Sequence, residues 1–319
     1  MTSVVDEIGV QQLSDEFADA VLDGFEQPRK SIPCRFLYDA RGSELFEEIT
    51  QLEEYYPTRT EIGLLKKYGP DIAERAGAGC AVVEFGSGSS RKTHILLKAL
   101  TQASAYVPID IDDAALKDAV TRLKSQFPHL ALHPVRADFG QSIELPDEIS
   151  DAPKLGFFPG STIGNFEQSA AVKFLADAGA LLGPESDLLI GADLRKDREI
   201  LIPAYDDARG ITAKFTLNLL HRINRELDGN FDVPRFAHKV IYNDDAGRIE
   251  IYIESLADQE VRVLGRRFSL AKGERLHVED SHKYTVPQFK ALAREAGWAS
   301  KQVWVDENNL FSMHYLTRI

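Results

Sequence analysis

A glycine-rich turn is the first feature of the chain whose residue types suggest chemistry. Residues 83–93 read VEFGSGSSRKT, in which Gly86, Ser87 and Gly88 separate an apolar stretch from a helix-like one. A strand, a glycine turn and a helix in this order form a cradle for a nucleotide, because glycine lets the backbone approach the ligand. A dinucleotide fingerprint requires a third glycine where this chain has Arg91. The turn therefore disfavours a nicotinamide oxidoreductase.

Acidic residues lie at the ends of the next two expected strands. Residues 105–111 end near Asp110, and residues 130–139 end with Asp138 and Phe139. Asp110 would accept hydrogen bonds from two ribose hydroxyls, while the Asp138–Phe139 pair suits the amino group and ring face of adenine. Asp110 could instead simply cap the following helix. Because successive parallel strands end at one ligand-binding edge, the combination favours adenosylmethionine, and no G-x-x-x-x-G-K-[ST] phosphate motif occurs.

The fourth expected strand, residues 154–161, runs into a polar turn that contains Gly160, Thr162 and Asn165. Asn165 offers an amide donor and an acceptor to a small zwitterion, although it could also cap a tight turn. The turn follows a strand at its carboxyl end, which is where an active site would open.

These residues must be positioned by alternating strands and helices. The expected strands are 81–85, 105–111, 130–139, 154–161 and 187–194. The expected helices between them are 93–100, 112–127 and 168–182. The alternation predicts an α/β fold with a mostly parallel sheet and helices on both faces.

The flanking regions differ from this pattern. An amphipathic helix is expected at 11–27, followed by an aromatic-rich segment that could form a lid and becomes helical from Thr58. One long helix is expected at 204–227, with the acidic doublet Asp206–Asp207 facing solvent. The later expected elements are hairpins within 240–256 and 261–279, a helix at 284–298 and a return to the sheet at 301–319.

Composition narrows the class of protein. The net charge is −13 and basic residues form no block, which argues against nucleic acid or an anionic membrane as partner. No apolar run approaches the roughly 18 residues of a membrane span, and the N-terminus lacks the features of a signal peptide. Cys34 and Cys80 lack metal-ligand spacing, so we expect no metal and a reducing cytoplasm. The absence of a long apolar stripe favours a monomer.

Five stretches together resemble the histidine-specific N-alpha-methyltransferases of ergothioneine biosynthesis. They are FLYDARGSELFEEITQLEEYYPTRTE, EFGSGSSRKT, GSTIGNF, PAYDDARGITAKFTLNLLHRINREL and HVEDSHKY, and they occur in the family's order from about residue 30 onward. The resemblance implies a Rossmann-like class I methyltransferase fold with a second α+β substrate-binding domain. It implies trimethylation of the α-amino group of L-histidine, through mono- and dimethyl intermediates, to histidine betaine (hercynine). S-adenosyl-L-methionine would be converted to S-adenosyl-L-homocysteine without a metal.

The resemblance also implies residue roles. The cofactor residues would be Gly86, Ser87, Gly88, Lys92, Asp110, Asp138 and Phe139. The amino-acid residues would be Phe46, Tyr55, Gly160, Thr162, Asn165, Tyr205, Ile251, Glu279 and Ser281. Asn165 and Tyr205 would bind the carboxylate, whereas Tyr55, Glu279 and Ser281 would contact the imidazole. Tyr38 would lie at the reacting amine as the catalytic candidate.

The spacing of Glu279 and Ser281 fits this role without the family. If the segment is extended, residues two apart share one face, and a carboxylate and a hydroxyl can bond the two ring nitrogens. The alternative is a solvated strand end. Ile251 stands where methionine is expected in histidine-specific members, so the ring pocket could tolerate other side chains.

The expected domains are a helical or lid segment at 1–60, a methyltransferase domain at 61–195, a substrate-binding domain at 196–285 and a return to the methyltransferase sheet at 286–319. Two alternatives stay open. Fungal relatives of the broader family methylate tryptophan derivatives, so the substrate could be another amino acid or aromatic amine. A protein that binds adenosylmethionine without turnover is the other alternative.

Overall fold

The computed structural model describes residues 3–86, 88, 90–111, 113–137 and 143–319, and side chains from residue 15 onward with gaps at 87, 89, 112–115, 118 and 138–142. The chain forms two compact units. Unit 1 comprises Met1–Tyr55 and Asp197–Ser281, and unit 2 comprises Tyr56–Lys196 and His282–Ile319. The chain therefore passes between the units after Tyr55, after Lys196 and after Ser281.

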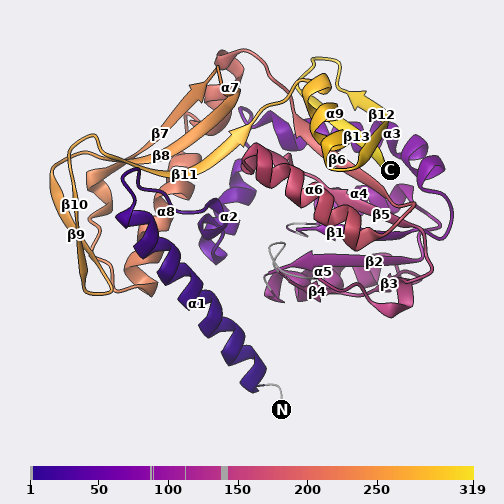
Figure 1. The fold of residues 1–319 in the computed structure, drawn as a ribbon, viewed down its shortest axis with the longest axis horizontal. Helices are drawn as coiled ribbons and strands as arrows, with labels where there is room; N and C mark the ends of the chain where they lie inside the picture. Colours follow the sequence, from indigo (N-terminus) through magenta and orange to yellow (C-terminus); the bar gives the residue numbers. More distant parts are fainter. Residues whose placement is uncertain (1–2, 87, 89, 112, 138–142) are drawn as a thin grey trace. The chain divides into compact units, whose positions relative to one another are not determined.

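Unit 2 contains a sheet with strand order β12-β13-β6-β5-β1-β2-β3, and β4 also pairs with β2. Pairing is parallel from β6 to β3, whereas β13 is antiparallel to both β6 and β12. The sheet is thus mostly parallel, and the predicted α/β class is confirmed (Figure 1). The strands are β1 (Ala81–Phe85), β2 (Ala105–Asp110), β3 (Ala131–Leu132), β4 (Val135–Arg136), β5 (Lys154–Phe158), β6 (Asp187–Asp193), β12 (Trp298–Val305) and β13 (Phe311–Arg318).

The third predicted strand is the exception in this sheet. The sequence predicts one strand at 130–139, but the described part forms the two short strands β3 and β4 on either side of His133 and Pro134. Proline has no N–H to donate and is therefore disfavoured inside a paired strand. The His133 N–H still donates to the carbonyl of Tyr106 at 3.0 Å, so the chain stays beside β2.

Apolar side chains cover both faces of this sheet. Val83, Val107 and Ile190 belong to one buried cluster, whereas their neighbours along the strands, Val82 and Leu189, belong to another. Strands buried on both faces read as nearly continuous apolar runs, as β1 does apart from Glu84. The helices of the unit are α3 (Tyr56–Ala76), α4 (Arg91–Ala99), α5 (Asp113–Gln126), α6 (Gln168–Leu182) and α9 (Val286–Glu295), with 3-10 turns η2 (Asp147–Ile149) and η3 (Thr162–Asn165).

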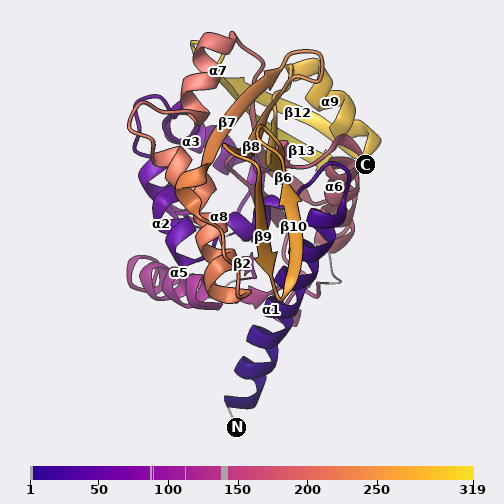
Figure 2. The same cartoon turned by 90° about the vertical axis from the view of Figure 1, so that its left-hand side faces the viewer.

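Unit 1 combines helices with antiparallel strands, which Figure 2 shows from the side of α8 and the β9–β10 hairpin. Its three-stranded sheet has the order β11-β8-β7, and β9 pairs with β10. Its helices are α1 (Ser3–Glu26), η1 (Cys34–Leu37), α2 (Ala40–Ile49), α7 (Arg198–Tyr205), α8 (Ile211–Glu226) and η4 (Val233–Arg235). Its strands are β7 (Phe236–Asn243), β8 (Arg248–Ser255), β9 (Gln259–Val263), β10 (Arg266–Leu270) and β11 (Arg275–His282).

The single long helix predicted at 204–227 is wrong, because the chain breaks between α7 and α8. Asp207 accepts hydrogen bonds from the N–H groups of Ile211 at 3.0 Å and Thr212 at 2.7 Å. These N–H groups lie in the first turn of α8, where no helical carbonyl is available to them. The expectation that the acidic doublet faces solvent is therefore wrong for Asp207, which is only 6% exposed, and holds for Asp206.

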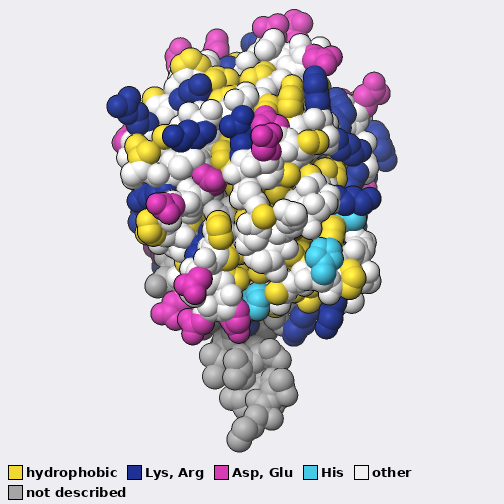
Figure 3. Space-filling view, turned by 90° about the vertical axis from the view of Figure 1, so that its right-hand side faces the viewer, with side chains coloured by type: hydrophobic (Ala, Val, Ile, Leu, Met, Phe, Trp, Pro, Cys, Tyr) yellow, Lys and Arg dark blue, Asp and Glu magenta, His cyan; other side chains and the backbone are white. Residues whose placement is uncertain are grey.

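No described helix is long and apolar enough to cross a membrane. On the face drawn in Figure 3, acidic and basic side chains are interspersed among neutral and apolar ones.

Asp207→Ala should lower the free energy of unfolding by about 1–2 kcal/mol, the usual effect of losing a helix cap. Although burial alone would raise it, the N–H groups of Thr212 and Ile211 hold the pKa of Asp207 below its ordinary value of 3.8. The stabilisation is thus complete above that value and is lost as pH falls through the lower folded-state pKa. Urea unfolding of the wild type, Asp207→Ala and the exposed control Asp206→Ala at pH 7 and pH 3 tests this. An equal loss in both variants, or a larger loss at pH 3, would contradict it.

Candidate active site

The turn after β1 has the conformation that its glycines predict. Gly86 has a φ of +80° and Gly88 a φ of +40°, and such values favour glycine. The Gly86 N–H donates to the carbonyl of Ile109 at 2.8 Å, which ties the turn to β2. Helix α4 then starts at Arg91, so its first N–H groups face the region beyond the strand ends. The predicted strand, turn and helix are all present.

Three strand ends bring described candidates for cofactor and amino-acid binding together. Strands β5, β1 and β2 are neighbours in the sheet and run parallel. Gly160 follows β5, Gly86 follows β1 and Asp110 ends β2, so these residues share one edge. Ser87, Asp138 and Phe139 lie outside the described residues. Roles in ligand binding stay predictions for all of them.

A buried glutamate that sequence reasoning missed joins two of these turns. Glu61 of α3 is 0% exposed and lies 2.6 Å from the ammonium of Lys92. Its carboxylate also accepts the N–H of Gly160 at 2.9 Å. Gly160 has a φ of +87°, and a Cβ there would lie 3.4 Å from Lys92 Nζ. Glu61 therefore fixes the lysine of α4 against the turn after β5. Its signal in the sequence is its place as the last residue of the YYPTRTE stretch.

A second buried acid, Glu84, stabilises the start of α4 next to the glycine turn. It is 1% exposed and accepts hydrogen bonds from Tyr106 and from Thr93 at 2.7 Å. Burial raises the pKa of Glu84 to about 8, against the opposing effect of these two hydroxyls. The three residues come from β1, β2 and α4, so the bonds fix the start of the helix relative to two strands.

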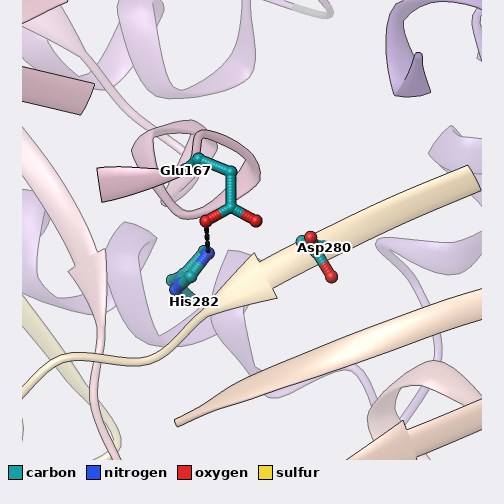
Figure 4. A group of neighbouring side chains, drawn as sticks. All are labelled: Glu167, Asp280 and His282. Atoms are coloured by element: carbon teal, nitrogen blue, oxygen red, sulfur yellow. Dashed lines mark ion pairs between the residues drawn. The ribbon is translucent and has the colours of Figure 1, made fainter. Parts of the chain in front are cut away.

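The turn after β5 contains the remaining candidates of unit 2. Thr162 is exposed and donates to the carbonyl of Pro159 at 3.0 Å, and Asn165 is half-buried at the end of η3. Between them, Gly164 packs so closely on the backbone of His282 that a Cβ would lie 2.8 Å from its carbonyl oxygen. His282 itself lies 3.9 Å from Glu167 through Nε2 (Figure 4). This distance marks an ion pair only if the ring is protonated.

Unit 1 gathers the aromatic candidates into one cluster. Tyr38 contacts Phe46 with ring centroids 5.5 Å apart and Phe215 at 5.3 Å. Tyr55 lies 6.2 Å from Phe46 and 6.1 Å from Tyr205. All four contacts are edge-to-face, the arrangement that aromatic rings favour. Phe46, Tyr205 and Phe215, which lie in α2, α7 and α8, thus form one aromatic cluster with Tyr38 and Tyr55.

The predicted extended segment around Glu279 is confirmed as strand β11. Glu279 and Ser281 therefore lie on the same face of it, and Ser281 is 4% exposed. The hydroxyl of Ser281 lies 2.9 Å from that of Tyr205. Ile251 is 2% exposed on the adjacent strand β8, as its alternating apolar pattern predicts. The Tyr205–Ser281 bond joins two residues that the resemblance assigns to opposite ends of the amino acid.

Glu279 influences the ionisation of two neighbours. Burial first, and then the negative charge of Glu279, raises the pKa of Tyr38 well above its usual value of 10. The same two causes raise the pKa of Cys34 to about 12. Tyr38 nevertheless keeps 37% of its surface exposed, so a ligand can reach it. Its hydroxyl is protonated at neutral pH and can donate a hydrogen bond, but it is no phenolate base.

Asp39, which sequence reasoning also missed, holds the Tyr38 segment in place. Its carboxylate accepts the N–H of Gly42 at 2.7 Å and caps α2. It also accepts from Asn218 at 2.7 Å and Arg225 at 2.6 Å on α8. A Cβ on Gly42 would lie 1.8 Å from the carbonyl oxygen of Leu37, so only glycine fits this turn. The signal is the Asp-Ala-Arg-Gly run directly after Tyr38.

Known proteins match most of the length of this chain. A family model described as "Histidine-specific methyltransferase, SAM-dependent" matches residues 17–318. The chain is 37% identical over 300 residues to the Histidine N-alpha-methyltransferase of Mycolicibacterium smegmatis, and 36% identical over 299 residues to that of Mycobacterium tuberculosis. Each match covers 92% of both proteins. Ergothioneine biosynthesis protein 1 of Neurospora crassa is 30% identical over 298 residues, which is 91% of this chain and 33% of that protein.

Glu61→Gln should weaken cofactor binding, because Lys92 loses its paired charge while the shape of the side chain is kept. Hydrogen bonds to charged groups contribute about 1.5–3 kcal/mol, and about 1.4 kcal/mol is a tenfold change in affinity. We expect the dissociation constant for S-adenosyl-L-homocysteine, measured by isothermal titration calorimetry, to rise about tenfold or more. Glu74→Gln, at an exposed position on the same helix, is the control and should change it by about twofold at most. Equal constants for all three proteins would contradict the role of Glu61.

Proposed function

Because the chain belongs to the family of histidine-specific, S-adenosyl-L-methionine-dependent methyltransferases, we propose that it trimethylates the α-amino group of L-histidine. The product is histidine betaine (hercynine), and the reaction is the first step of ergothioneine biosynthesis. The observation that carries the choice of histidine is the shared face of Glu279 and Ser281 on β11, with Tyr205 bonded to Ser281.

These groups match the hydrogen-bonding needs of a neutral imidazole. The ring has one N–H donor and one acceptor nitrogen, whereas a carboxylate only accepts and a hydroxyl can donate. Glu279 would accept from the N–H, and Ser281 would donate to the other nitrogen while it accepts from Tyr205. An indole has a donor alone and would offer no acceptor to the Ser281 hydroxyl. Sites that hydrogen-bond a polar ring reject analogues without the matching group strongly.

The cofactor candidates fit an adenosylmethionine. Gly86 and Gly88 have backbone conformations that favour glycine, and Glu61 holds Lys92 against the turn after β5. We assign Gly86, Gly88, Lys92 and Asp110 to this ligand, together with Ser87, Asp138 and Phe139. When bound, S-adenosyl-L-methionine supplies a methyl group activated by its sulfonium charge.

The chain's own part in methyl transfer is to hold the amine and to accommodate its growing charge. A free α-amino group has a pKa of about 8, so a neutral fraction exists at physiological pH without a strong base. The protonated Tyr38 hydroxyl offers its oxygen to an amine N–H, and the faces of Tyr38 and Phe46 can stabilise the cationic product. Asn165, Gly160 and Thr162 would bind the amino acid's backbone groups. Ile251 would form an apolar wall of the ring pocket.

The proposal includes the setting of the reaction. The partners are L-histidine and its mono- and dimethyl intermediates, and the protein acts as a cytoplasmic monomer without a metal, nucleic acid or membrane. The methyltransferase domain (61–195) with the return segment 286–319 would bind the cofactor, while 1–60 and 196–285 would bind the substrate.

Mass spectrometry of the purified protein with S-adenosyl-L-methionine, all common amino acids and histamine tests the proposal. Histidine alone should gain three methyl groups. Histamine has the ring without the carboxylate and should not react. Methylation of tryptophan or another amino acid would overturn the choice of histidine and point to Ile251, whereas binding of the cofactor without any methylation would overturn the enzyme.

Glu279→Gln should change substrate discrimination more than maximal rate. The amide oxygen is an uncharged and weaker acceptor for the imidazole N–H, so we expect kcat/KM for histidine to fall by about tenfold to a hundredfold. The KM for S-adenosyl-L-methionine should stay the same. Steady-state kinetics with both substrates measure this, and Glu260→Gln on the exposed side of β9 is the control. A loss confined to the cofactor would contradict the assignment.

Tyr38→Phe should lower the rate by a common factor at every pH. Because burial and Glu279 keep the Tyr38 hydroxyl protonated through the working range, the rate should rise with deprotonation of the amine in both proteins. A lost neutral hydrogen bond predicts a fall of about tenfold. The measurement is kcat/KM between pH 6 and pH 10. A change in the shape of the profile would show that Tyr38 titrates during the reaction.

A further inference from the structure

A buried carboxylate at the end of β6 binds three hydrogen-bond donors that the proposed reaction does not use. Asp193 is 0% exposed. The hydroxyl of Tyr56 reaches its two oxygens at 2.7 and 2.9 Å. Lys196 lies 2.6 Å from one oxygen and Lys283 lies 2.9 Å from the other. The Asp193 N–H also donates to the hydroxyl of Ser161 at 2.9 Å. All these residues belong to unit 2.

The partners of Asp193 mark every passage of the chain between its two units. Tyr56 is the first residue of unit 2 after the first passage, and Lys196 is the last before the second. Lys283 is the second residue after the third passage, which follows Ser281. Tyr56 lies 137 residues from Asp193 in the sequence. The Asp193 carboxylate thus bonds segments that are far apart along the chain.

Backbone bonds strengthen the same junction. The Tyr284 N–H donates to the Asp193 carbonyl at 3.0 Å, and the Arg195 N–H donates to the Tyr284 carbonyl at 2.9 Å. Leu194 and Tyr284 form a parallel bridge. Lys196 also donates to the carbonyl of Leu194 and to the Tyr56 hydroxyl at 2.6 Å. The chain on each side of the second and third passages is therefore held by both its backbone and its side chains.

The charges of Asp193, Lys196 and Lys283 explain why these chain segments keep one arrangement. A buried carboxylate needs compensating charge and hydrogen bonds, and Lys196 and Lys283 supply both. Although burial alone would raise it, the ammonium groups of Lys283 and Lys196 hold the pKa of Asp193 below its usual range. The pKa of Lys196 is lowered to about 8, first by burial and also by the positive charge of Lys283. A displaced chain segment would leave one of these charges buried without its partner.

We propose that Asp193 is a positioning residue for methyl transfer, which fixes the points where all three connections leave unit 2. Two of these connections begin with residues assigned to the amino acid, because Tyr55 precedes Tyr56 and Ser281 lies two residues before Lys283. Asp193 acts through these neighbours and touches neither ligand. The inference rests on the proposed roles of Tyr55 and Ser281.

The chain contains a matched control for a test by mutation. Tyr56→Phe removes a tyrosine–aspartate bond at the carboxyl end of β6. Tyr315→Phe removes one at the amino end, where the Tyr315 hydroxyl donates to Asp187 at 2.6 Å. Both tyrosines are almost fully buried, at 2% and 3% exposed. Both variants therefore lose a tyrosine–aspartate bond from the same strand, but only Tyr56 also accepts from Lys196 and adjoins a connection between the units.

The experiment measures kcat and KM for histidine, the dissociation constant of S-adenosyl-L-homocysteine and Tm for the wild type and both full-length variants. We expect Tyr56→Phe to lower kcat/KM for histidine about tenfold, with the dissociation constant changed by about twofold at most. Tyr315→Phe should lower Tm comparably and keep kcat/KM within about twofold. Equal kcat/KM losses in the two variants, or an unchanged Tyr56→Phe, would overturn the positioning role. A wild type that does not methylate histidine would overturn the proposed function instead.

Discussion

The need to neutralise one buried carboxylate constrains how this chain can be organised. Asp193 ends β6 inside unit 2, and water cannot compensate its charge there. Its partners must come from parts of the protein that lie next to it in space. They are residues at or beside the points where the chain passes to and from unit 1. The sheet, the start of α3 and the segment after β11 therefore depend on the same group.

The same principle operates at the ligand edge of the sheet. Glu61 lies between Lys92 and the turn after β5, and Glu84 accepts from Tyr106 and Thr93 beneath the turn after β1. Neither acid is part of the predicted binding set, but Glu61 fixes Lys92 and Gly160, which are, and Glu84 bonds residues next to the glycine turn. Buried acids on α3 and β1 thus hold the turns and the helix start around the candidate ligand site. Such loops need a rigid support, because small displacements of a binding group cost activity.

The sequence predicts the sheet and its ligand edge well, because these depend on local patterns. Apolar runs, glycine turns and acidic strand ends identified β1, β2, β5 and β6 with the turns after them. The errors have local causes as well. Pro134 divides the third strand, and Asp207 starts a new helix where helical periodicity alone suggests continuity. Both residues were visible, but their effect depends on which N–H groups need partners in the fold.

The bonds of Glu61, Asp193 and Tyr205 could not be predicted from spacing. Glu61 and Gly160 are 99 residues apart, and Tyr205 and Ser281 are 76 apart. Nothing in a local pattern identifies such pairs, since they arise only when distant elements pack. Glu279 and Ser281 are the opposite case, because residues two apart in one strand share a face whatever the tertiary structure. The face of a strand on which a residue lies is thus predictable, whereas the partner that the residue bonds on another element is not.

A double-mutant cycle tests the central claim most directly, namely that the Asp193 junction acts through the substrate residues next to it. The measurement is kcat/KM for histidine in the wild type, Tyr56→Phe, Ser281→Ala and the double variant. If the junction positions Ser281, Tyr56→Phe should lower kcat/KM less in a protein that already lacks the Ser281 hydroxyl. The two effects should then couple by about 0.5 kcal/mol or more. Losses that add fully would contradict the account, because Tyr56 and Ser281 would then contribute independently.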